Sequence, residues 1–149
     1  MTEEQRTIAN NISRIRERIT ESALRAGRSA ENIALIAITK YADLAQTRLV
    51  ALAGLKNLGE SRPQVLWEKS SALKDNAIRW HLVGQLQRNK VAKTIKTARL
   101  IHSVDSIRLL QAIETESNKV NKITDILLEI NISGDEDKHG FFPESLKET

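Results

Sequence analysis

The chain opens with a helical pattern of apolar residues. Ile8, Ile12, Ile15 and Ile19 recur at spacings of four, three and four residues. This spacing predicts an amphipathic helix with one apolar stripe. Gly27 follows the pattern and is expected to cap the carboxyl end of that helix.

The rest of the chain repeats a short apolar run followed by a longer amphipathic segment. The expected strands cover residues 32–40, 55–61, 78–84, 99–105 and 124–133, and the expected helices cover residues 43–54, 61–73, 87–98 and 106–119. Ser61 and Ser106 are candidate N-caps, and Pro143 is expected to open a further helix. Near-continuous apolar strands alternating with helices indicate an α/β fold with a parallel sheet. Periodicity alone leaves open a doubly wound sheet or the first five units of a (β/α)8 barrel.

Composition fits one globular domain. The chain has 149 residues, of which 40% are hydrophobic and 28% charged, unlike a disordered sequence. It contains no cysteine, which excludes disulfides, thiol nucleophiles and cysteine-ligated metals. No apolar run approaches the roughly 20 residues that span a bilayer, and the polar N-terminus shows no secretory signal. We therefore expect a cytoplasmic protein without a membrane partner.

Lys40 is the candidate reactive residue. Functional side chains of both architectures lie in the loops that follow the strands, and Lys40 is the only lysine among the expected strand-end residues. One interpretation is a strand-end lysine that extends its amine into water. The other is a desolvated amine with a lowered pKa that attacks a carbonyl and forms a Schiff base.

Other catalytic motifs are missing from the sequence. It has no G-x-G-x-x-G after the first expected strand, no Walker A motif and no G-x-S-x-G elbow, which argues against Rossmann, P-loop and α/β-hydrolase chemistry. His81, His102 and His139 lack metal-ligand spacing, so no metal site is expected. We predict that His81 is a hydrogen-bonded core residue, whereas His102 lies nearer a strand end.

A basic stripe suggests an alternative function. Lys90, Lys93 and Lys96 recur every three residues opposite Val91 and Ile95, in a chain of net charge +4. The stripe is either a solvated helix face or a contact for phosphate or nucleic acid. Aromatic residues make up only 3% of the chain, which argues against base stacking and makes nucleic acid the disfavoured partner.

Five segments, taken in order, resemble the pyridoxal-phosphate homeostasis proteins (YggS/PROSC-like). These segments are LIAITK, LGESRPQ, IRWHLVGQLQRNK, IHSVDS and EINISGDEDKHGF. The third is the most distinctive, and the similarity covers residues 5–142. Two positions depart from the family pattern: Ser61 stands where Asn is also found, and Gln85 stands where His is common.

The resemblance implies a (β/α)8 TIM barrel of the alanine racemase N-terminal type. Residues 1–149 are similar to about the first five β/α units, so we expect a single partial barrel domain that is truncated at its C-terminus. The family's phosphate-binding segments and pyridine-nitrogen partner belong to later strands. Family members are monomers, and we expect this short chain to associate in order to cover its open edge.

The resemblance also implies a function. Lys40 would carry pyridoxal 5′-phosphate (PLP) as a Schiff base, and Ser61, Gln85, His102 and Asn131 are weaker candidates for cofactor contacts. The family is expected to hold and buffer PLP inside the cell and to supply PLP-dependent apoenzymes without turnover, so no catalytic residue is predicted. An amino-acid racemase-like enzyme is a further alternative, disfavoured because racemases of this type use a second domain.

Overall fold

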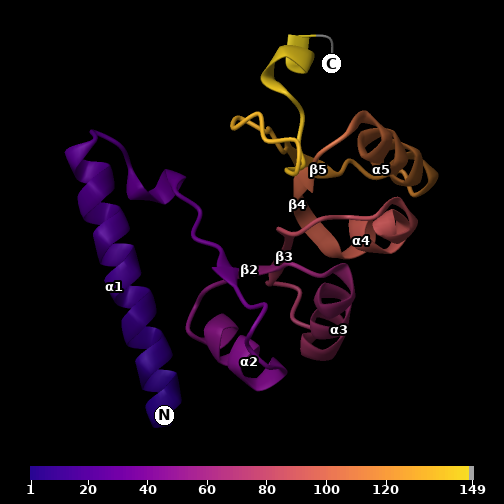
Figure 1. The fold of residues 1–149 in the computed structure, drawn as a ribbon. Helices are drawn as coiled ribbons and strands as arrows, with labels where there is room; N and C mark the ends of the chain where they lie inside the picture. The colour runs from indigo at the N-terminus through magenta and orange to yellow at the C-terminus, as the bar shows by residue number, and fades with distance from the viewer. Residues whose placement is uncertain (148–149) are drawn as a thin grey trace.

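The computed structural model describes residues 1–147 as alternating helices and strands (Figure 1). The helices are α1 (Glu3–Arg25), α2 (Leu44–Leu52), α3 (Pro63–Leu73), α4 (Val91–Thr97) and α5 (Ile107–Lys119), and the strands are β1 (Ala37–Ile38), β2 (Asn57–Glu60), β3 (Arg79–Leu82), β4 (Ala98–Val104) and β5 (Asp125–Leu128). Short 3-10 helices cover η1 (Ala30–Asn32), η2 (Arg88–Lys90) and η3 (Pro143–Lys147).

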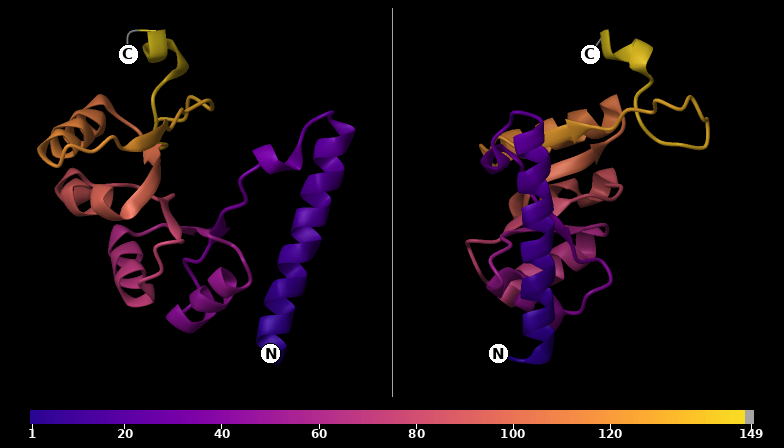
Figure 2. Two further views of the ribbon diagram at one scale, coloured as in Figure 1. Left: turned by 180° about the vertical axis from the view of Figure 1, so that it is seen from behind. Right: turned by 90° about the vertical axis from the view of Figure 1, so that its left-hand side faces the viewer.

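The five strands form one parallel sheet in the sequential order β1-β2-β3-β4-β5. Helices α2 to α5 follow the curved sheet along one side, and α1 lies beyond β1, next to α2 (Figures 1 and 2). A doubly wound sheet would reverse its strand order and place helices on both faces. Sequential strands with helices on one face instead match an arc of a β/α barrel, which decides between the two predicted architectures.

The core lies between the sheet and helices α2 to α5. Leu58, Leu82 and Ile101 project from three neighbouring strands and are fully buried there. Val91 and Ile95 of α4 are also fully buried. Of the predicted basic stripe, Lys93 and Lys96 are exposed, whereas Lys90 is half-buried and ends η2. The helix-facing side of the sheet therefore carries most of the apolar packing.

Local sequence signals set several helix ends. The Ser106 hydroxyl accepts from the Leu109 amide at the start of α5, as predicted. Gly27 follows the end of α1 with a φ of 64°, in the left-handed region that glycine tolerates. The prediction for Ser61 is wrong: Arg62 holds the N-cap position of α3 without a side-chain cap, and Pro63 begins the helix. Proline at the first helical position has no amide that needs capping.

Several other predicted elements are shorter or divided, among them the strand predicted at 124–133, which pairs as Asp125–Leu128. The predicted strand 32–40 pairs only as Ala37–Ile38, because β1 lies at the sheet edge with one short neighbour. The predicted helix 87–98 divides into η2 and α4, and Ala98 already belongs to β4. Pro143 opens a 3-10 helix. Across residues 1–147, no helix combines the length and apolarity that crossing a bilayer requires.

Candidate functional site

Lys40 lies at the centre of a tight turn between β1 and α2. The Ala42 amide donates to the Thr39 carbonyl at 2.9 Å, which closes the turn with Lys40 and Tyr41 between them. Asp43 then caps α2 through the amide of Gln46. The turn thus joins the carboxyl end of a strand to a well-capped helix, the position where β/α barrels place functional groups.

The Lys40 side chain is exposed to solvent. Its Nζ lies 4.9 Å from the centre of the Tyr41 ring, and that ring is 90% exposed. The two side chains lie together because both residues belong to a turn, in which the alternation of side chains along a strand does not apply. The described residues also do not desolvate the amine, contrary to the reactive-lysine interpretation.

A buried lysine lies directly beneath this turn. Lys69 of α3 is 8% exposed, and its Nζ donates to the carbonyls of Thr39 (2.8 Å) and Ala42 (2.9 Å). It also forms an ion pair with Glu60 Oε1 at 2.6 Å. Glu60 ends β2 and is 1% exposed, and it accepts the Thr39 hydroxyl at 2.5 Å.

Sequence reasoning missed Lys69, although a signal was present. Lys69 stands three residues after Leu66 and four before Leu73, both of which pack in the core. A charged residue in the apolar stripe of a helix needs a buried partner. Glu60, an acidic residue at the end of an apolar strand, has the same signal and supplies that partner.

Two histidines meet on neighbouring strands. His81 Nδ1 lies 3.0 Å from His102 Nε2, and His81 Nε2 lies 3.4 Å from Asn57 Oδ1. Because the Asn57 oxygen can only accept, His81 donates from Nε2 and accepts from His102 at Nδ1. His81 is therefore buried and hydrogen-bonded, as predicted, but it lies in register with Gly59 on the sheet face opposite the helix-side core.

Burial sets the charge state of this pair. Burial, followed by the nearby charges of His102, Arg99 and Arg79, lowers the pKa of His81 to about 4. Burial also lowers the pKa of His102. Both rings are therefore neutral at pH 7. His102 lies within β4 and contacts His81, so its predicted cofactor role remains a prediction.

Ser61 and Gly84 bring the loops after β2 and β3 into close contact. A Cβ atom on Gly84 would lie 2.1 Å from the Ser61 carbonyl oxygen, so only glycine allows this approach. The Gly84 carbonyl also accepts the Ser103 hydroxyl at 2.6 Å. Ser61 thus lies at the strand-end edge, where its backbone has a packing role.

The loop after β5 reaches towards the loops after β3 and β4. Gln85 Nε2 lies 3.3 Å from His139 Nε2, and His139 Nδ1 lies 3.9 Å from Asp105 Oδ2. Asn131 is buried and organises this loop, since its amide donates to the Asp135 carbonyl at 2.7 Å and its Oδ1 accepts from Gly134. Gln85 therefore lies at the exposed edge, whereas the Asn131 amide is occupied by its own loop.

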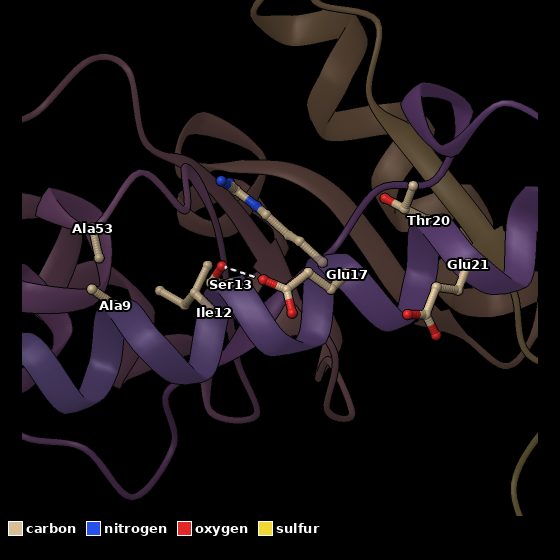
Figure 3. Close-up of a pocket in the computed structure, with 8 residues that line it drawn as sticks. Ala9, Ile12, Ser13, Glu17, Thr20, Glu21 and Ala53 are labelled. Carbon is tan, nitrogen blue, oxygen red and sulfur yellow. Dashed lines mark hydrogen bonds between the residues drawn. The ribbon is translucent and has the colours of Figure 1, made fainter.

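A cavity lies away from these residues. It is an open pocket of about 430 Å³ between α1 and the end of α2, lined by Ile12, Ser13, Glu17 and Ala53 among others (Figure 3). Ser13 donates to Glu17 at 2.9 Å within it. None of the predicted site residues lines this cavity. In residues 1–147, no group of three or more His, Cys, Asp or Glu side chains could hold a metal ion.

Curated proteins that share one name resemble this chain. No protein-family model matches the chain. It is 39% identical to the pyridoxal phosphate homeostasis protein of Aquifex aeolicus over 137 residues, 92% of this chain and 60% of the relative. It is 33% identical to the protein of that name from Pseudomonas aeruginosa over 140 residues, 94% of this chain and 61% of the relative. The chain thus spans about three fifths of the length of these relatives.

Two solved structures of PipY resemble this chain. PipY of Synechococcus elongatus PCC7942 without PLP superposes with a TM-score of 0.82 at 28% identity, covering 95% of this chain and 61% of PipY. The PLP-bound form of PipY superposes with a TM-score of 0.73 at 29% identity, over 87% of this chain and 61% of PipY. The curated homologues of this chain are thus named pyridoxal phosphate homeostasis proteins, and its structural neighbours include PipY, over about three fifths of the length of each.

Proposed function

We propose that this chain binds pyridoxal 5′-phosphate covalently through Lys40 and serves in PLP homeostasis within the cell. The names of the curated relatives and the PLP-bound structure of PipY support the cofactor. The relatives are named as homeostasis proteins and not as enzymes, which supports a carrier without turnover. PLP-dependent apoenzymes are the recipients that such a carrier would supply.

The accessible amine of Lys40 is the observation that carries this proposal. PLP supplies an aldehyde, which condenses with a primary amine. Two lysine side chains meet the turn after β1, and their surroundings differ. Lys69 is buried with three acceptors around its ammonium group, whereas Lys40 is exposed. Lys40 is therefore the one of the two that an aldehyde in solution can reach.

The strand-end edge offers further polar groups to the cofactor. Gln85 is exposed there beside His139, and Ser61 is half-buried in the adjoining loop. These side chains would orient the ring or phosphate by hydrogen bonding. Asn131 would act indirectly, by holding the loop that carries His139.

A titration with PLP tests the proposal. The wild-type chain should develop the visible absorbance of a lysine-bound pyridoxal group, and Lys40→Ala should lose it. Lys56→Ala is a matched control, because Lys56 is a partly exposed lysine beside β2 that pairs with Asp75. The control should bind as the wild type does. Undiminished absorbance from Lys40→Ala would contradict the assignment of Lys40.

A further inference from the structure

We propose that Lys69 is a positioning residue for Lys40, holding the turn that presents the reactive amine. This inference rests on the proposed function of Lys40. Lys69 itself is excluded as the attacking amine, because it is buried and paired with Glu60. Its contacts are instead directed at the backbone of the turn.

The Lys69 ammonium bridges both ends of the turn. Thr39 and Ala42 are the first and fourth residues of the turn, and the carbonyl of each accepts from Lys69 Nζ. The Thr39 carbonyl also accepts the Ala42 amide. Lys40 and Tyr41 lie between these anchors, so a change of the turn conformation would break charge-assisted hydrogen bonds.

The Lys69 ammonium group is in turn fixed by a third acceptor, the Glu60 carboxylate. A lysine ammonium has three donors, and the third donates to Glu60 Oε1 at 2.6 Å. The same carboxylate oxygen accepts the Thr39 hydroxyl. Because Thr39, Glu60 and Lys69 are all buried, these contacts join the ends of β1 and β2 to α3 in a site screened from water.

This arrangement has a consequence for the site. The exposed side chain of Lys40 keeps its rotamer freedom, so the position of its amine can be fixed only through its backbone. A reactive group on a fixed backbone loses less freedom when it engages its partner. The ion pair thus supplies the rigid support that the described surroundings of Lys40 otherwise lack.

Hydrogen exchange without PLP tests the bridge directly. In Lys69→Met, the Ala42 amide should exchange at least about tenfold faster than in the wild type, because its turn opens more often. The matched control is Lys56→Met, which removes the partly exposed ion pair with Asp75 and should leave Ala42 exchange unchanged. Equal Ala42 exchange in Lys69→Met and the wild type would overturn the proposal.

A second variant without the two buried charges allows the same test if Lys69→Met does not fold. If Lys69→Met does not fold, Glu60→Gln combined with Lys69→Met removes both buried charges while keeping similar volumes. The bridge to the turn is still missing in this double variant. It should therefore show the same fast Ala42 exchange, and protected Ala42 exchange would again overturn the proposal.

Labelling with PLP supplies the second measurement. Borohydride-fixed label on the Lys40 peptide should fall at least about fivefold in the double variant, without new label on exposed lysines elsewhere. Because the chain has no native cysteine, Lys69→Cys can be alkylated with 2-bromoethylamine while unfolded and then refolded. The restored ammonium should recover both label and exchange protection, and label that stays low would contradict a positioning role.

The two proposals fail in different ways. A wild-type chain that takes no label at Lys40 would contradict the proposed function, and fast Ala42 exchange in Lys69→Met would still support the bridge. Normal Lys40 labelling in the double variant would contradict the positioning role and leave the proposed function standing.

Discussion

The two faces of the sheet differ sharply. On the helix side, Leu58, Leu82 and Ile101 are fully buried beneath α2 to α5. On the other side, Ile38 packs towards Gly59 yet stays 47% exposed. The helix side therefore holds the fold together, while the opposite face and the strand ends carry polar groups and the exposed Lys40.

The buried ion pair joins these two regions, so breaking it should have the largest effect on stability. Lys69→Met leaves the Glu60 carboxylate buried without its partner, and we expect a loss of about 3 to 5 kcal/mol in the free energy of unfolding. Lys56→Met, which breaks an exposed pair, should cost less than about 1 kcal/mol. Urea denaturation measures both, and equal losses would contradict the account.

A pair of truncations compares the faces directly. Leu58→Ala removes a fully buried side chain from the helix side and should lower the free energy of unfolding by about 3 kcal/mol. Ile38→Ala acts on the partly exposed face and should cost about 1 kcal/mol. The same urea titrations apply, and a larger cost for Ile38→Ala would reverse the comparison.

Acid should weaken the fold through the histidine pair. The folded pKa of His81 is lowered to about 4, below its unfolded value of about 6.5. Between these values the unfolded chain binds a proton that the folded chain excludes, so stability falls as pH drops from 6.5 towards 4. The loss attributable to His81 is at most about 3 kcal/mol.

Denaturation at pH 7 and pH 4.5 checks this expectation. His81→Gln keeps a hydrogen-bonding group and removes the titration, so its stability should change less between the two pH values. An unchanged pH dependence in His81→Gln would place the acid sensitivity elsewhere.

The smallest effect is expected on the outer surface of α4. Lys93→Glu combined with Lys96→Glu alters exposed side chains of α4, a helix that follows β3 and not β1. PLP label on Lys40 should change by less than about twofold, because exposed charges at a distance are screened by salt. A strong loss of label at moderate salt would give the basic stripe a role in cofactor binding.

Much of the fold was predictable because its signals are local. Strands and helices follow from periodicity, and Ser106 and Gly27 mark helix ends through capping chemistry. The family segments also led to Lys40. Residue type alone misplaced the start of α3 at Ser61, because the N-cap is Arg62 and the helix begins at Pro63.

Long-range contacts could not be predicted in the same way. Lys69 meets the turn after β1 across a sequence separation of 27 to 30 residues, and only the folded backbone brings them together. The length of β1 was also set by a distant part of the chain. Because β1 pairs over only two residues, Lys40 and Tyr41 lie in a turn, with their side chains together. The paired length of an edge strand depends on its neighbour and not on its own apolar run.

The most direct test of the account is peptide mapping after borohydride reduction of the PLP-treated chain. A positioned, accessible Lys40 predicts one pyridoxyl adduct, located on the peptide that contains Lys40. Adducts spread over exposed lysines, or an adduct elsewhere with Lys40 unmodified, would contradict the assignment of Lys40 as the residue that holds the cofactor.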